Sequence, residues 1–239
     1  MVVSGIYAID LIGWRHKVAA IYEQVRTVHE DDPRAAWELF RRERDRLYRE
    51  HPCSALTPGQ RARFEGFRYF DYDPAFCVEG EIDHTVEETA FVAHISEGAL
   101  THRRIATARF WLAGSERALD IFWLDIYGGG LWIPVGDRTN GASSYGGGRY
   151  LFDTAKGANL GISADGANIR LDFNFLYPPS CALNPAWVCP LCPPQNRLAL
   201  PIEAGEMHDS AYQHQRSWAP VHAQAHSTGR FPLSGSVAL

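Results

Sequence analysis

The spacing of apolar residues in the first part of the chain predicts two long helices. Between residues 10 and 27, apolar side chains recur at intervals of three and four with charged side chains between them, which is typical of an amphipathic helix that buries one face. Asp32 is a good N-cap and Pro33 suits the first helical position, so a second helix is predicted from there to the stop at His51-Pro52. Both helices need a partner surface for their apolar faces.

A short third helix is predicted before the pattern changes. Thr57 and Gln60 have the spacing of a capping box, with Pro58 at the first helical position. The run RRERDRLYRE at residues 41–50 mixes charges of both signs, and we interpret most of it as a solvated helix face. Residues 1–66 are therefore predicted to form a helical region that packs on the rest of the chain.

After Gly66 the chain consists of short β-branched and aromatic runs separated by turn residues, which predicts an antiparallel β-domain over residues 67–206. Strands are predicted at residues 67–70, 76–82, 86–95, 100–113, 118–127, 131–135, 149–152, 167–177 and 198–202. Hairpin turns are predicted at Glu97-Gly98, Gly114-Ser115, Asn140-Gly141 and Asp165-Gly166. Residues 119–126 are apolar on both faces and are placed centrally. The expected fold class is α+β, with N-terminal helices followed by a β-sandwich or a barrel-like domain.

Composition narrows the class of protein. A chain of 239 residues with 46% apolar content can bury a large core. The net charge of −5 gives no broad basic footprint, so nucleic acid is not expected as a partner. No apolar run approaches the roughly 18 residues that span a bilayer, so no membrane association is expected. The first residues lack a charged segment before their apolar ones, which predicts a soluble, cytoplasmic protein.

The composition of the last residues and the number of cysteines allow two further predictions. Residues 207–239 show little periodicity and are rich in Ser, Gln, Ala and His, so they are predicted to form a mobile tail. Five cysteines are too few for a disulfide scaffold in a chain of this length, and their odd number favours thiols.

Polar side chains gather around the predicted strand at residues 167–177. Asp172 and Asn174 share one face of this strand, opposite an apolar face, and Cys181 follows in a proline-rich loop. A polar stripe in a β-domain either faces water or lines a cavity. Neighbouring elements bring further polar groups, namely Arg149, Tyr150, Asn196 and Glu206. We therefore predict a pocket that binds a polar small molecule, with catalysis and oligomeric state left open.

A hydrolase is the first alternative. His51 could act as a general base, with Ser54 or Cys181 as the nucleophile. The sequence contains no G-x-S-x-G elbow, and termination of the preceding helix explains His51 and Ser54 more simply.

A non-catalytic structural protein is the second alternative. In this interpretation the same polar residues form a buried network, with Arg149 pairing Asp172 while Asn174 and Asn196 bond to loop backbone.

Metal and phosphate sites receive little support from the sequence. Cys181, Cys189 and Cys192 could bind zinc together with a histidine, but only one Cys-x-x-Cys pair is present and buried or free thiols are favoured. The triple-glycine runs at residues 128–130 and 146–148 lack the lysine and helix start of a phosphate loop. No metal ligand is predicted, and the cofactor is unknown.

Several motifs together resemble one family. They are Arg44-Asp45-Arg46-Leu47, His51-Pro52-x-Ser54, Gly148-Arg149-Tyr150-Leu151, Leu171-Asp172-Phe173-Asn174, Cys189-Pro190, Asn196-Arg197-Leu198 and Ala204-Gly205-Glu206. Over about residues 10–207 the chain resembles the domain-of-unknown-function 1684 (DUF1684) family. The resemblance implies a single domain with a helical N-terminus and a β-rich remainder, and it implies no established activity.

The resemblance also adds to the candidate site. It implies polar residues at Arg44, Asp45, His51, Ser54, Arg149, Asp172, Asn174, Cys181, Asn196 and Glu206, so Arg44 and Asp45 join the candidate ligand-binding set. Cys192 departs from the family pattern, which weakens the zinc interpretation further. Pro178-Pro179 stands where the family tends to have Asn-Pro.

Overall fold

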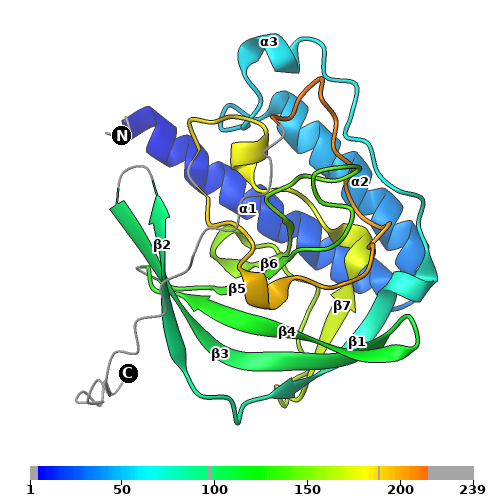
Figure 1. Ribbon diagram of the computed structural model, residues 1–239. Helices are drawn as coiled ribbons and strands as arrows, with labels where there is room; N and C mark the ends of the chain where they lie inside the picture. Colours follow the sequence, from blue (N-terminus) through cyan, green and yellow to red (C-terminus); the bar gives the residue numbers. More distant parts are fainter. Residues whose placement is uncertain (1–4, 96–97, 127, 188, 215–239) are drawn as a thin grey trace.

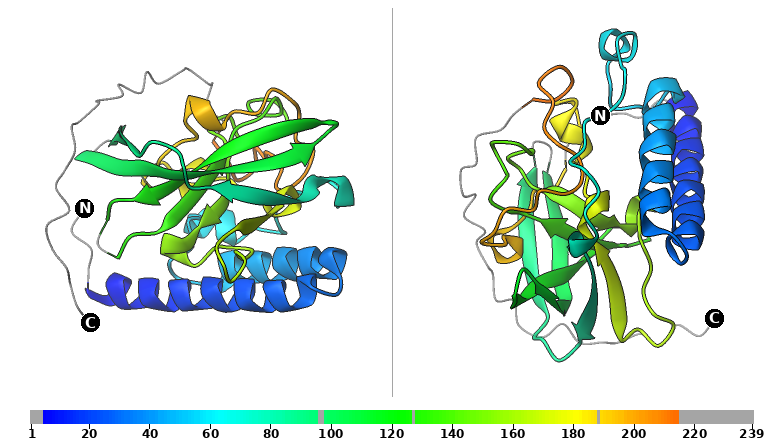
Figure 2. Two further views of the ribbon diagram at one scale, coloured as in Figure 1. Left: turned by 90° about the horizontal axis from the view of Figure 1, so that it is seen from below. Right: turned by 90° about the vertical axis from the view of Figure 1, so that its right-hand side faces the viewer.

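Two long helices lie side by side along one side of a curled antiparallel sheet (Figures 1 and 2). The computed structural model describes residues 5–95, 98–126, 128–187 and 189–214. The helices are α1 (Gly5–His29), α2 (Pro33–Glu50) and the short α3 (Pro58–Arg61). The strands are β1 (Cys77–Asp83), β2 (Thr89–Ile95), β3 (Gly98–Leu112), β4 (Ser115–Leu124), β5 (Leu131–Val135), β6 (Arg149–Asp153) and β7 (Asn168–Asp172). The expected α+β class is confirmed.

The helix boundaries follow the predicted caps. The Asp32 carboxylate accepts a hydrogen bond from the Ala35 amide at 2.9 Å, and the His51 amide donates to the Leu47 carbonyl at 3.0 Å. At α3, the Gln60 side chain accepts from the Thr57 amide at 2.7 Å while the Thr57 hydroxyl accepts from the Gln60 amide at 3.3 Å. The predictions for α2 and α3 are confirmed because each cap satisfies amides that the helix cannot pair itself.

The strands form one sheet in the order β6-β5-β4-β3-β1-β7, and every pairing is antiparallel. β3 is long enough to pair with β2 along its first half and with β1 along its second half. A tight turn with positive φ at Ala113 (51°) and Gly114 (75°) joins β3 to β4. β4 lies inside the sheet, as its two-sided apolar pattern predicts.

Two predicted strands, residues 67–70 and 198–202, are extended segments without a ladder. The first makes an isolated bridge between Tyr69 and Glu206, and the second follows a bridge between Gly136 and Arg197. Phe67 in the first segment and Leu198, Leu200 and Ile202 in the second are buried, which explains the strand-like pattern. These two predictions are wrong because burial of alternate side chains does not require backbone pairing along the whole segment.

The predicted strand at residues 167–177 is interrupted after Asp172. β7 ends where the Asp172 carboxylate accepts from the Asn174 amide at 3.0 Å, which starts a 3₁₀ turn over Phe173–Phe175. Beyond this turn, Tyr177 forms an antiparallel bridge with Tyr150 of β6, where the Tyr150 amide donates to the Tyr177 carbonyl at 2.7 Å. The chain that leaves one edge of the sheet therefore reaches the opposite edge.

The main core lies between the concave face of the sheet and the two long helices. Val25 of α1 and Phe40 of α2 are buried in the same cluster as Leu119 and Ile121 of β4 and Leu171 of β7. A second cluster joins the start of α1 to the loop after α2, with Trp14 beside Tyr48 at a ring-centroid distance of 5.1 Å. The sheet thus supplies the partner surface that the amphipathic helices need.

The described chain continues as packed structure past residue 206, where the sequence predicts the tail to begin. The Tyr212 ring packs against Phe64 at a centroid distance of 5.1 Å, and its hydroxyl donates to the Arg63 carbonyl at 2.8 Å. The remainder of the predicted tail, residues 215–239, lies outside the described residues.

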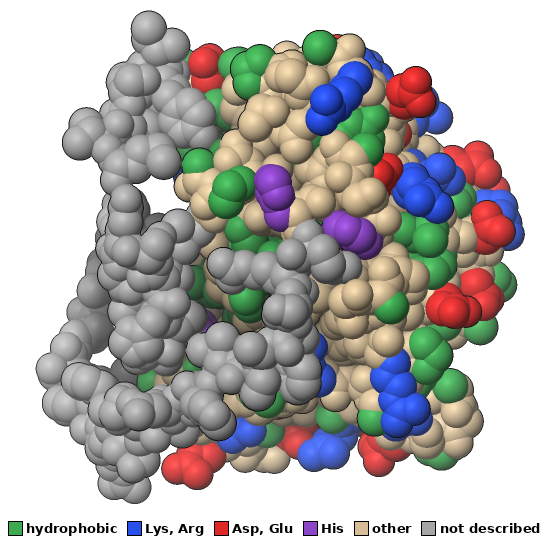
Figure 3. Space-filling view, turned by 45° about the horizontal axis from the view of Figure 1, so that its top comes forward, with side chains coloured by type: hydrophobic (Ala, Val, Ile, Leu, Met, Phe, Trp, Pro, Cys, Tyr) green, Lys and Arg blue, Asp and Glu red, His purple; other side chains and the backbone are tan. Residues whose placement is uncertain are grey.

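Among the described residues, no helix could span a membrane. On the face shown in Figure 3, basic and acidic side chains are interspersed among polar ones. Histidine side chains lie near the centre of that face.

His102 generates a prediction about the pH dependence of folding. Its ring is 5% exposed and lies among Phe91, Phe122 and Trp132, at centroid distances of 5.6, 5.1 and 5.3 Å. Burial lowers the pKa of His102 to about 4. The unfolded chain therefore gains a proton near pH 6.5 that the folded protein takes up only near pH 4.

We expect the stability of the wild-type protein to fall by about 2–3 kcal/mol from pH 7.5 to pH 4.5 through this residue alone. The variant His102→Phe keeps an aromatic ring and should lack that part of the loss. Urea unfolding of both proteins at the two pH values measures the difference. Equal pH dependence in the two proteins would contradict the assignment.

Candidate functional site

Arg149 is fully buried and holds the segment at residues 202–206 in place. Its Nη2 donates to Asp137 Oδ2 and to the Ile202 carbonyl, both at 2.9 Å. Its Nη1 donates to the carbonyls of Ala204 and Glu206. These four acceptors come from within the protein, so Arg149 acts as an anchor between β6 and the chain after β7. The sequence does not single out Asp137, because nothing in its spacing links it to Arg149.

Gly205 lets the anchored segment approach the sheet closely. Its φ is +79°, and a Cβ at this position would lie 2.7 Å from the Leu176 carbonyl oxygen. The next residue, Glu206, donates its amide to the same carbonyl at 2.8 Å. The Ala-Gly-Glu motif is thus explained by backbone conformation and by the carboxylate that follows it.

Asp172 and Asn174 form a second buried group, at the end of β7. Asp172 Oδ1 accepts from the Asn174 side-chain amide at 2.8 Å, and Oδ2 lies 2.9 Å from Nε2 of His29. The Asn174 side chain also accepts from the Asp73 amide at 3.1 Å and donates to the Asp73 carbonyl at 2.9 Å. No interaction with Arg149 joins this group to the first one within the described part of the chain.

Asn196 fills a gap between β4 and β5. Its side-chain oxygen accepts from the Asp120 amide at 2.8 Å, while its nitrogen donates to the carbonyls of Asp120 (2.9 Å) and Pro134 (2.8 Å). Because Pro134 has no amide proton, the Asn196 amide takes the place of a backbone pair at this point in the sheet.

Arg44 and Glu206 form a third group, a buried ion pair with Arg44 Nη2 2.8 Å from Glu206 Oε2. The guanidinium carbon lies over the rings of Tyr48, Phe67 and Tyr177, at 4.5, 4.6 and 5.1 Å from their centroids. Burial raises the pKa of Glu206 to about 8, although the Arg44 charge opposes this. The Gln213 side chain donates to the other carboxylate oxygen, Glu206 Oε1, at 2.7 Å.

Asp45, His51 and Ser54 all accept hydrogen bonds from backbone amides near the end of α2. Asp45 Oδ1 accepts from the Phe67 amide at 3.0 Å, and His51 Nδ1 accepts from the Cys53 amide at 3.1 Å. Ser54 Oγ accepts from the Leu56 amide at 3.2 Å. These contacts agree with the helix-terminating interpretation of His51 and Ser54.

The three cysteines of the proline-rich loop separate into two places. Cys192 is buried beside Gly136 and Gly148, whereas Cys189 lies beside Cys181. A hydrogen bond from Cys181 and the nearby Lys156 charge lower the pKa of Cys189 to about 6. Their sulfur atoms form no three-ligand group among the described residues.

A cavity of about 60 Å³ lies between the two long helices and the end of β6. It is lined by Trp14, Val18, Ile21, Tyr22, Phe40, Arg44, Leu47, Tyr48, Tyr150, Lys156, Ala158, Tyr177, Pro179 and Ser180. Of the candidate ligand-binding residues, Arg44 and Tyr150 contribute to it. The common hollow expected around Arg149, Asp172, Asn174 and Cys181 is not found among the described residues, because the first three have separate partners inside the fold.

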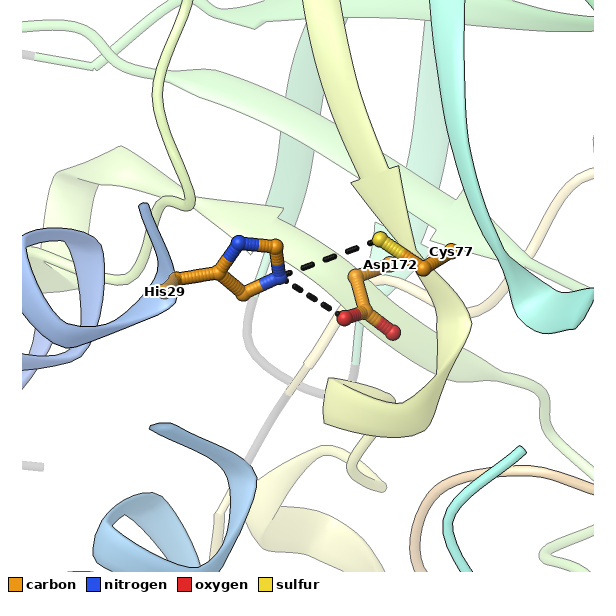
Figure 4. A group of neighbouring side chains, drawn as sticks. All are labelled: His29, Cys77 and Asp172. Carbon is orange, nitrogen blue, oxygen red and sulfur yellow. Dashed lines mark hydrogen bonds and ion pairs between the residues drawn. The ribbon is translucent and has the colours of Figure 1, made fainter. Parts of the chain in front are cut away.

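His29, Cys77 and Asp172 form a group of potential metal ligands that sequence analysis missed (Figure 4). Cys77 stands opposite Asp172 in the register of β1 and β7, and His29 ends α1. The three ligand atoms lie within 4.8 Å of one another. His29, Cys77 and Asp172 are far apart in the sequence, so no motif with a fixed spacing links them.

The anchor role of Arg149 predicts a large effect on stability. Arg149→Leu leaves the buried Asp137 carboxylate without its ionic partner, which typically costs about 3–5 kcal/mol. Arg109→Leu is a matched control, since Arg109 pairs with Asp83 on the surface and such pairs contribute about 0–1 kcal/mol. Chemical denaturation of both variants measures the two effects. Similar losses in both would contradict the anchor role.

The lowered pKa of Cys189 predicts selective alkylation. Near pH 7 its thiolate should react with iodoacetamide faster than Cys77 or Cys192, whose thiol pKa values burial raises to about 12. The labelling rate should reach half its maximum near pH 6. Mass spectrometry of wild type and Cys181→Ala reads out the site, and the midpoint should rise in the variant because alanine has no hydrogen-bond donor at this position. A wild-type midpoint near the ordinary thiol pKa would overturn this expectation.

Comparison with known proteins agrees with the resemblance seen in the sequence. The solution NMR structure of an uncharacterised protein from Haloarcula marismortui is similar, with 33% sequence identity and a TM-score of 0.54 over 76% of this chain and 98% of that one. No curated protein matches the chain. The family described as "Protein of unknown function (DUF1684)" matches residues 62–207. The chain therefore belongs to the DUF1684 family.

Proposed function

We propose that the protein binds a small anionic molecule in the cavity between α1, α2 and β6. The observation that carries this proposal is the pair of cationic side chains, Arg44 and Lys156, in the wall of an otherwise apolar and tyrosine-rich cavity. The curled sheet would then act as a barrel-like container with the two helices as its lid.

The two cations lie at different depths. The Arg44 side chain is 7% exposed, whereas the Lys156 side chain is 39% exposed and pairs with Asp153 at 3.1 Å. Lys156 is thus accessible to an incoming anion, and Arg44 offers a planar fork suited to a carboxylate deeper inside.

Two buried donors at the cavity also lack partners. The Tyr22 hydroxyl and Arg44 Nε make no hydrogen bond within the described part of the chain. Leaving a buried donor without a partner costs about 1–3 kcal/mol, so an acceptor in the cavity would relieve this cost. Both residues line the cavity, which makes a bound anion a suitable acceptor.

The size of the cavity limits the ligand. Its volume is about 60 Å³, while one water needs roughly 10–15 Å³ and a cavity of about 150 Å³ holds benzene. A short-chain carboxylate suits these limits, with its carboxylate on Arg44 and its alkyl end against Val18 and Ile21.

The other candidate residues support this site indirectly. For Arg149, Asn174 and Asn196 we infer a structural role, because their polar atoms bond within the protein. No specific observation favours hydrolysis by His51 with Ser54 or Cys181, and we propose binding without catalysis.

Thermal shift and calorimetry with acetate, propionate, butyrate and hexanoate test the proposal. We expect butyrate or a shorter acid to stabilise the wild-type protein, since a ligand at 100 times its Kd adds about 2.7 kcal/mol. Tyr22→Phe and Lys156→Met should each weaken binding about tenfold or more, and Lys17→Met is an exposed control that should not. Chloride at the same ionic strength corrects for salt effects. Absence of saturable binding by all four acids, or equal binding in the three variants, would overturn it.

A further inference from the structure

We propose that His29, Cys77 and Asp172 bind one divalent cation of the zinc class, with a fourth position left for solvent. The three ligands converge from three elements: the end of α1, the start of β1 and the end of β7 (Figure 4). This site is independent of the anion cavity, because none of the three residues lines that cavity.

The distances between the ligand atoms are close to those of a tetrahedral site. With Zn–N and Zn–O distances of about 2.0 Å and Zn–S of about 2.3 Å, tetrahedral angles place N and O about 3.3 Å apart and N and S about 3.5 Å apart. In the protein, His29 Nε2 lies 2.9 Å from Asp172 Oδ2 and 3.8 Å from Cys77 Sγ. Shifts of a few tenths of an ångström would therefore admit the ion.

A set of outer hydrogen bonds orients the carboxylate. Asp172 Oδ1 accepts from the Asn174 amide at 3.0 Å and from its side chain at 2.8 Å, which leaves Oδ2 to face His29. Asn174 is held in turn by both backbone groups of Asp73. Such outer partners commonly fix the ligands of a metal site, and here they explain why an amide follows the acid by two residues.

The arrangement suits a metal better than a nucleophile. In a catalytic Cys-His-Asp group the two ring nitrogens of the histidine would contact different partners, but here Nε2 faces both the thiol and the carboxylate. A bound cation would replace the thiol proton, which leaves to solvent, and would take the Nε2 lone pair after that nitrogen loses its proton.

The environment gives the ion a route to the site. His29 and Asp172 are buried, whereas Cys77 on β1 is half-buried, so an ion would reach the site past Cys77. A mixed nitrogen, sulfur and oxygen set selects zinc-class ions over Mg²⁺ or Ca²⁺, which prefer oxygen ligands.

Cobalt titration of the chelator-treated, desalted full-length protein tests the proposal. We expect one equivalent of Co²⁺ to produce a thiolate charge-transfer band and the visible bands of tetrahedral Co²⁺, and one equivalent of Zn²⁺ to displace it. Cys77→Ser should lose the charge-transfer band, and His29→Gln should weaken binding at least tenfold. Asn174→Ala should weaken it about 10–100-fold, as loss of an outer partner usually does.

The double variant Cys181→Ser/Cys189→Ser is the matched control, since it removes the other half-buried thiols among the described residues. It should bind cobalt like the wild type, and circular dichroism of each variant checks that it folds. The proposal is overturned if folded wild type gives no charge-transfer band, if folded Cys77→Ser keeps it, or if the double variant loses it. Zn²⁺ should also raise the Tm of the wild type and the double variant but not of Cys77→Ser.

Discussion

A guanidinium group inside a protein requires acceptors for its donors and a partner for its charge, and this fold is built around two such groups. Arg149 has Asp137 and three backbone carbonyls around it. Arg44 has Glu206 and three aromatic rings. Both sets of contacts end in residues 202–206, so this segment links the sheet to α2. Breaking either set would leave buried charge, which costs more than most single contacts contribute.

The need for buried polar groups to have partners also explains why the polar residues of the family motifs lie in separate parts of the structure. Asp172 and Asn174 satisfy each other together with His29 and Asp73, and Asn196 completes the backbone pairing of β4 and β5. Each of these residues pairs buried polar groups that would otherwise lack a hydrogen-bond partner. Their presence in the motifs therefore does not require contact with a ligand. Arg44 differs from them: it belongs to this internal network and also lines the cavity.

Local signals determined how much of the structure the sequence could predict. The caps at Asp32 and at Thr57 with Gln60 are decided within four residues, so α2 and α3 follow directly from sequence. The hairpin between β3 and β4 is equally local. Extended segments such as residues 198–202 have the apolar pattern of a strand, but pairing depends on distant chain and cannot be read from the pattern.

The site was less predictable for the same reason. Arg149 was grouped with Asp172 because both are polar residues near strand ends, yet its actual partner is Asp137, which shares no motif with it. His29 and Cys77 are isolated in sequence and meet Asp172 only because α1 ends beside the end of β7 (Figure 4). The sequence indicates which polar side chains are candidates for a site. Only the tertiary structure shows which of them are in contact.

The position of Glu206 has a consequence for how the protein is made. α1 and α2 leave the ribosome first, but the carboxylate that accompanies Arg44 and the carbonyls that accept from Arg149 are synthesised near the end of the described chain. Arg44 of α2 cannot be buried together with its partner until Glu206 has been synthesised. Formation of the Arg44–Glu206 pair must therefore wait for a contact between distant parts of the chain, which makes folding slow compared with that of a domain built from local contacts.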